Sequence, residues 1–105
     1  MGAQHSLHSR SAMASRWRRR TMCVLIADGP TPAALRRVSA AGAFLETNAR
    51  PGIGAAIELR HPEAGLIAGA VCAEADDGIA VRFDFCERSV AFALAAIAAD
   101  MSRPA

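Results

Sequence analysis

The chain has 105 residues, of which 52% are apolar, and a formal net charge of +2, values that fit one small globular domain with tails. Its apolar runs are too short for a membrane span, and its three cysteines are far apart without a Cys-x-x-Cys pair, which argues against a zinc or disulfide framework. We therefore expect a cytoplasmic protein with reduced thiols, and without a Ser/His/Asp, Cys/His or paired-acid constellation we expect neither an enzyme nor a resident metal or cofactor.

Positive charge is concentrated at the start of the chain. Residues 1–20 carry five arginines and no acid, whereas the remainder carries seven arginines and ten acids. Such a segment suits an anionic partner, and the alternative is a solvated charge run. Residues 1–15 show no apolar periodicity and are expected to form a disordered tail, with the true start at Met1 or Met13.

The first predicted strand covers residues 21–27, a short apolar run with β-branched members that ends at the turn signal Asp28-Gly29-Pro30. Two short strands are predicted next, at 34–38 and 43–47, on either side of a kink of small residues. Within that kink, Gly42 suits a bulge or a close approach of two backbones.

Alternation of apolar and polar residues marks the later strands. Residues 55–60 place Ile57 and Leu59 on one face of a half-buried strand. A strand of mostly small residues at 66–74 leads into a hairpin turn at 76–78. The last strand, 79–85, carries four large apolar residues on one face, Ile79, Val81, Phe83 and Phe85. Short strands separated by turn residues favour a small antiparallel barrel or sandwich.

A change of period predicts a C-terminal helix at residues 86–100. Asp84 is the expected N-cap, with Glu87 reaching back in a capping box. Four apolar residues then recur at helical spacing and are expected to close one end of the barrel: Val90, Leu94, Ile97 and Met101. The expected fold is therefore mainly β, a small antiparallel β-barrel with a C-terminal α-helix.

Three motifs occur in an order that resembles the PilZ domain family. Arg16 and Arg20 form an Arg-x-x-x-Arg pair before the first strand, and Ser39 and Gly42 fit a Ser-x-x-Gly motif between two strands. Residues 78–83 are similar to the late strand of that family. The resemblance implies a bacterial signalling module at residues 16–101, with tails at 1–15 and 102–105, and many PilZ domains bind the second messenger cyclic di-GMP.

The resemblance also implies a ligand site. The candidate cyclic di-GMP-binding residues are Arg16, Arg20, Arg37, Ser39 and Gly42. Arginine forks clamp phosphates and donate to guanine O6 and N7, and glycine lets a ligand approach the backbone. Arg37 departs from the family pattern, which has Asp or Asn there, because arginine has only donors and cannot accept a guanine N–H.

Two functions follow from this departure. The first is a nucleotide-sensing module in which cyclic di-GMP orders the arginine arm against the barrel. The second is a degenerate PilZ domain that binds only an unidentified protein partner. Trp17 fits either a staple of the arm onto the barrel or a base-stacking platform. A membrane is not expected as a partner, and nucleic acid is disfavoured because the body has no basic face or aromatic platform.

Overall fold

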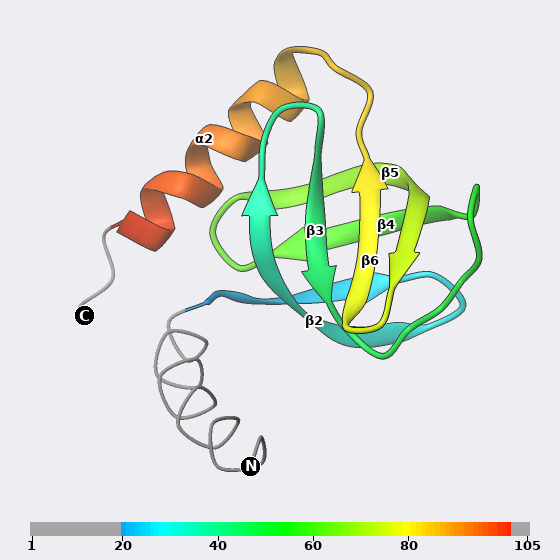
Figure 1. Ribbon diagram of the computed structural model, residues 1–105. Helices are drawn as coiled ribbons and strands as arrows, with labels where there is room; N and C mark the ends of the chain where they lie inside the picture. The colour runs from blue at the N-terminus through cyan, green and yellow to red at the C-terminus, as the bar shows by residue number, and fades with distance from the viewer. Residues whose placement is uncertain (1–19, 102–105) are drawn as a thin grey trace, which may run out of the picture.

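The computed structural model describes residues 20–101, which form a β-barrel with one helix beside it (Figure 1). The elements in chain order are β1 (Met22–Ile26), β2 (Pro30–Val38), β3 (Gly42–Glu46), β4 (Ala56–His61), β5 (Gly65–Ala75), β6 (Gly78–Arg82) and α2 (Glu87–Met101). The expected arginine arm and both tails lie outside these residues, apart from Arg20. Within the described part of the chain, no helix is long and apolar enough to cross a membrane.

The six strands close into a barrel in the order β1-β2-β3-β6-β5-β4, with β4 pairing back onto β1. Every neighbouring pair is antiparallel. Tight hairpins connect most neighbours, because turn residues such as those at 76 and 77 fall between the alternating segments. The predicted fold class, a mainly β antiparallel barrel with a C-terminal helix, is confirmed.

Apolar side chains at every second strand position fill the barrel interior. In β4, Ile57 and Leu59 are buried, whereas Glu58 and Arg60, which alternate with them, face outward and form an ion pair of 3.7 Å. The same period operates in β6, where Ile79 and Val81 are buried. The interior cluster is aliphatic for most of its members, which include Cys23, Leu25, Leu45, Ile67 and Val71.

Strand β2 starts at Pro30, earlier than the predicted start at residue 34. Proline removes a hydrogen-bond donor from the ladder, so Pro30 and Pro32, within three residues, argue against a strand that is paired on both sides. The structure avoids this conflict, because β2 pairs with β3 only from Ala34 onward and its first part pairs with β1 alone. The carbonyl of Pro32 is also satisfied, since the Thr47 hydroxyl donates to it at 2.9 Å.

The predicted last strand is too long. Strand β6 ends at Arg82, and Phe83 is still buried, but the Phe85 side chain is 74% exposed. The chain leaves the barrel at this point to enter α2, so the alternation of residues 79–85 does not continue into the core at Phe85.

The helix cap also differs from the prediction. The Cys86 backbone N–H donates to the Ser89 hydroxyl at 3.0 Å, and that hydroxyl donates to the Cys86 carbonyl at 3.0 Å. Ser89 therefore occupies the return position of the capping box, and it is completely buried. Asp84 lies two residues too early to cap a helix that begins at Glu87.

Helix α2 packs on the barrel through small residues and one phenylalanine, not through the predicted stripe. Its buried residues are Ser89, Phe92, Ala93 and Ala96. The Phe92 ring packs edge-on against Phe83 and His61, at centroid distances of 5.7 and 6.0 Å. The predicted core stripe is instead exposed, with exposed fractions of 37% for Val90, 64% for Leu94, 40% for Ile97 and 79% for Met101.

Candidate ligand-binding face

A β-bulge in β2 places two consecutive arginines on the outside of the barrel. Leu35 pairs with Leu45 and points inward, yet Arg37 pairs with Phe44, so Arg36 is an extra residue in the ladder. In a regular strand the residue after an outward-facing Arg36 would face the core. The bulge turns Arg37 outward and returns Val38 to the interior, where it packs against the core cluster.

The motif that follows forms the β2–β3 hairpin. Ser39 and Gly42 exchange backbone hydrogen bonds of 2.8 and 3.3 Å, which leaves Ala40 and Ala41 as the two loop residues. The Ser39 hydroxyl accepts from the Ala41 N–H at 3.1 Å. This hydroxyl therefore stabilises its own turn, as serines in loops commonly do, and its donor and a second lone pair face solvent for another partner.

Gly42 is required for contact between β3 and β6. A Cβ atom at this position would lie 2.2 Å from the Val81 carbonyl oxygen, which belongs to the backbone of the facing strand. The prediction of a close backbone approach at Gly42 is confirmed, and its partner is the barrel itself. The bulge lies in the neighbouring strand, between Leu35 and Arg37.

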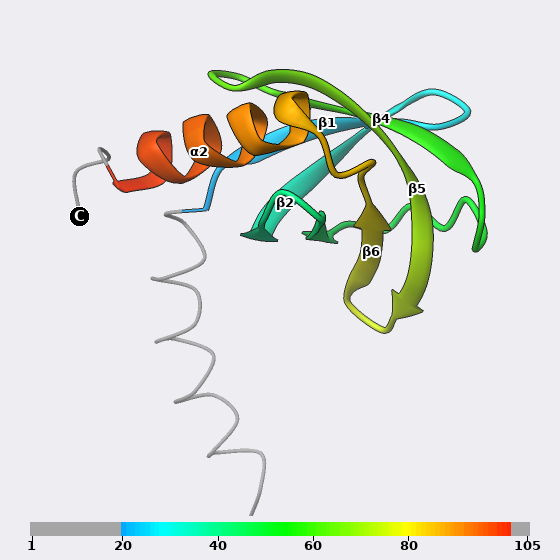
Figure 2. The ribbon, with the colours of Figure 1, turned by 90° about the horizontal axis from the view of Figure 1, so that it is seen from above.

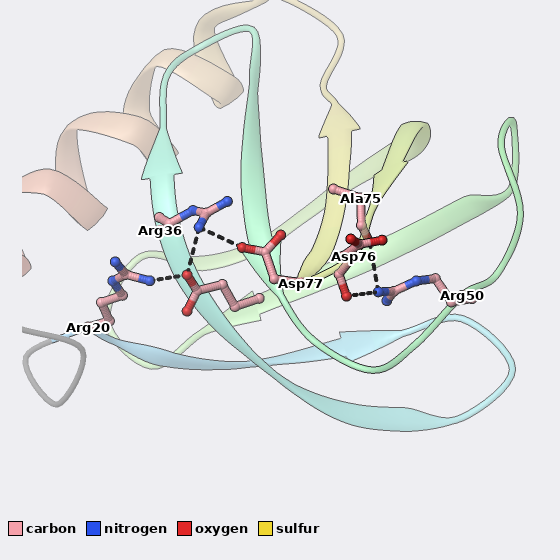
Figure 3. A network of polar contacts seen from close by, with 7 residues as sticks. Arg20, Arg36, Arg50, Ala75, Asp76 and Asp77 are labelled. Carbon is pink, nitrogen blue, oxygen red and sulfur yellow. Dashed lines mark hydrogen bonds and ion pairs between the residues drawn. The ribbon is translucent and has the colours of Figure 1, made fainter. Parts of the chain in front are cut away.

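Two arginines converge on one carboxylate at the end of β3 that is remote from this hairpin (Figure 3). Arg20 and Arg36 both donate to the same oxygen of Glu46, the latter at 3.0 Å. Arg36 also donates to Asp77 at 2.9 Å, which joins β2 to the β5–β6 turn. The Glu46 side chain is only 12% exposed, so this ion-pair network is partly shielded from water.

Phe44 provides an aromatic support beneath the arginines. The Arg36 guanidinium carbon lies 4.1 Å from the centre of the Phe44 ring, and that of Arg37 lies 5.6 Å from it. Although Phe44 is on the outer face of β3, these neighbours leave only 8% of it exposed. Within residues 20–101, Arg37 makes no ion pair, so its donors face the surface.

A groove of about 700 Å³ runs beside these residues. One side is made by the β2–β3–β6 surface, with Arg36, Arg37, Ser39 and Arg82. The opposite side is the C-terminal half of α2, which Figure 2 shows extending away from the barrel beside β2. The groove is thus basic along the strands and apolar along the helix, where Ile97 and Met101 line it.

The structure brings together three of the five predicted site residues. Arg37, Ser39 and Gly42 line the groove, whereas Arg20 lies toward the other end of β3 and is linked to Arg36 through their shared partner Glu46. Arg16 lies outside the described residues. The sequence did not predict four residues of this face: Arg36, Phe44, Glu46 and Asp77. For Phe44 and Glu46 a signal was present, because they lie two and four residues after Gly42 and therefore on the same face of β3.

Among residues 20–101, no three His, Cys, Asp or Glu side chains are grouped to hold a metal ion. Burial raises the pKa of the Cys23 thiol to about 11, so this thiol stays protonated in the barrel core. Cys72 and Cys86 are exposed free thiols.

In comparisons with known proteins, no family model matches the chain, and neither a curated protein nor a solved structure does.

Proposed function

We propose that the chain is a PilZ-type module that binds cyclic di-GMP on the outer β2–β3 face. The observation that carries the proposal is a row of three arginines along this face, in which Arg37 follows Arg36 next to the Ser39–Gly42 hairpin and Arg36 shares the Glu46 carboxylate with Arg20. These arginines come from an arm before β1 and from the end of β2, the two places where the resemblance implies ligand residues.

The charge of this face suits a dianion. Four arginines and three carboxylates lie on it or at its edge, which leaves a net charge of +1: Arg20, Arg36, Arg37 and Arg82 with Glu46, Asp77 and Asp100. Cyclic di-GMP carries two phosphates, and bidentate arginine–phosphate pairs are among the strong charge-assisted hydrogen bonds. A purine can also stack on an arginine fork that is itself supported by the Phe44 ring.

Binding would require an exchange of partners at Glu46. In the free protein this carboxylate accepts from both Arg20 and Arg36, in the place that a phosphate would take. A ligand that displaces it must compensate two partly shielded ion pairs. Once released, Glu46 offers an acceptor for guanine N–H groups, which Arg37 cannot supply. We therefore expect weak binding by the wild type.

The second candidate function is binding of a protein partner without nucleotide. Arg37 favours it, because this residue replaces the acceptor of the family motif. The Glu46 network favours it as well, since Arg20 and Arg36 already have an anionic partner within the chain.

Calorimetric titration with cyclic di-GMP separates the two candidates. We expect the wild type to bind, and Arg20→Ala and Arg36→Ala each to weaken binding about five- to tenfold, the scale of one lost charge-assisted hydrogen bond. Arg60→Ala is the matched control, because Arg60 lies on β4 and pairs only with Glu58 at 3.7 Å among the described residues. Absence of heat at hundreds of micromolar ligand would leave the protein-binding function.

A further inference from the structure

The outward side of α2 has no charged residue for most of its length. From Ser89 to Ala99 the chain contains none, and the exposed positions of this stretch are all apolar, among them Val90, Leu94 and Ile97. A surface helix normally carries polar residues on the side opposite its core contacts. An exposed stripe of this kind indicates a surface that another chain segment or partner covers.

This stripe continues into the groove beside β2. Ile97 and Met101 belong to the stripe and also line the groove, whose other apolar walls include Leu35 and Val38. Among residues 20–101, the one acidic residue that lines the groove is Asp100, on the helix side, whereas the lining arginines are on the strand side. The helix side of the groove therefore offers an apolar slot with one carboxylate at its edge.

We propose that residues 1–19 of this chain cover that slot, with Trp17 inserted between Ile97, Met101 and the end of β2. Thr21 itself lines the groove, so the segment that precedes it begins at the groove edge. Trp17 is four residues before Thr21, a distance of up to about 14 Å in extended chain. Ile97, Asp100 and Met101 line the same groove as Thr21, so this part of α2 is the part that the segment before Thr21 meets first.

Charge directs the segment to the helix side. Residues 1–19 contain four arginines and no acid, so Arg36, Arg37 and Arg82 on the strand side repel the segment, while Asp100 attracts it. The slot thus forms the helix side of the same groove whose strand side carries Arg36 and Arg37. The inference stands whether or not cyclic di-GMP binds.

A tethered segment also suits the size of the surface better than a second copy of the chain. The stripe contains four large side chains on a helix of 15 residues, whereas specific dimers bury about 1,200–2,000 Å² in total. A short tether gives its segment an effective concentration on the order of millimolar, so a small apolar contact is enough to hold it.

Intrinsic fluorescence tests this directly, because Trp17 is the only tryptophan and the chain has no tyrosine. In the full chain without nucleotide, we expect blue-shifted emission and protection from acrylamide compared with the same chain in denaturant. Ile97→Lys and Met101→Lys should shift emission toward the denatured value and raise quenching severalfold. Ala95→Lys is the control, since Ala95 is exposed on another side of the same helix.

Three results would overturn the proposal. One is wild-type emission and quenching equal to those in denaturant, and another is a blue shift that both groove variants leave unchanged. The third is a blue shift that disappears on dilution, which would assign the slot to a second copy. Circular dichroism confirms that each variant is folded, and Met101→Lys keeps the test valid because Met101 is 79% exposed and contributes little to the core.

Discussion

Arg37 pairs with Phe44 across the β2–β3 ladder, although the pairing of Leu35 with Leu45 would place Arg36 there in a regular strand. This single offset puts two arginines side by side over one aromatic ring, at 4.1 and 5.6 Å from its centre. The candidate site is therefore a product of one β-bulge and not of strand alternation.

The two arginines differ in what they contribute to stability. Arg36 has two carboxylate partners and the closer ring contact, whereas Arg37 is exposed. We expect Arg36→Ala to lower the free energy of unfolding by about 1 kcal/mol, and Arg37→Ala by less than about 0.5 kcal/mol. Urea unfolding of both variants measures this, and equal losses would mean that the network around Glu46 adds nothing to stability.

Gly42 should not tolerate a methyl group. Its Cβ would meet the Val81 carbonyl oxygen at 2.2 Å, so the β3–β6 pairing must shift to accommodate alanine. We expect Gly42→Ala to destabilise the barrel by at least about 2 kcal/mol. Gly29→Ala is the matched control, because no atom lies within 4 Å of its Cβ position. A thermal unfolding midpoint for Gly42→Ala equal to that of Gly29→Ala would contradict the packing described.

Substitutions on the two sides of α2 should differ strongly in how much they lower the free energy of unfolding. Phe92 is 3% exposed and packs on Phe83 and His61, so Phe92→Ala should cost about 3–5 kcal/mol. Leu94 is 64% exposed, and Leu94→Asp should change stability by no more than about 1 kcal/mol. Thermal unfolding of the two variants compares them, and a larger loss for Leu94→Asp would place the helix in the orientation that the sequence predicts.

Alkaline pH should weaken the fold through Cys23. Burial raises the pKa of this thiol from 9.0 to about 11, so the folded state holds a proton that the unfolded state releases. The stabilisation is complete below pH 9 and is lost as the pH rises toward 11, by up to about 1.4 kcal/mol per pH unit. The chain has no lysine or tyrosine, which leaves cysteines as the side chains that titrate in this window.

Urea unfolding at pH 8 and pH 10.5 reads this effect, with Cys23→Val as the variant that removes it. A wild-type protein with the same free energy of unfolding at both pH values would show that Cys23 ionises freely in the folded state. Cys72 and Cys86 are exposed free thiols present in both proteins, so the difference between wild type and variant reports Cys23.

Most of the barrel could be predicted from the sequence, and the reasons lie in single residues. Ile57 and Leu59 alternate with charged residues, which predicts a strand, and turn residues separate the predicted strands. The two signals therefore place the same strands. The first part of β2 was not predicted because it contains Pro30 and Pro32. A strand accepts proline only where the proline nitrogen faces an unpaired edge, and the sequence does not show which side of β2 is paired.

The candidate site and the helix orientation could not be predicted in the same way. A bulge leaves no periodic signal, since it is one extra residue that tertiary pairing selects at Arg36. In α2 the larger apolar residues suggested the core side, but the barrel end accepts Ser89, Ala93 and Ala96, whose small size lets the helix approach closely. Side-chain size and hydrophobicity therefore predicted that Leu94 faces the core. The helix instead packs through its small residues, which allow its backbone to lie close to the barrel.

The measurement that tests the proposed function most directly is a paired calorimetric titration of the wild type and Arg37→Asp with cyclic di-GMP. Arg37→Asp supplies the missing acceptor on a face that retains Arg20 and Arg36, so we expect weak wild-type binding and roughly tenfold tighter binding by the variant. Absence of binding by both proteins at hundreds of micromolar ligand would contradict the nucleotide-binding function. Tight wild-type binding that Arg37→Asp weakens would contradict the role given to Arg37, and would make this arginine a ligand residue.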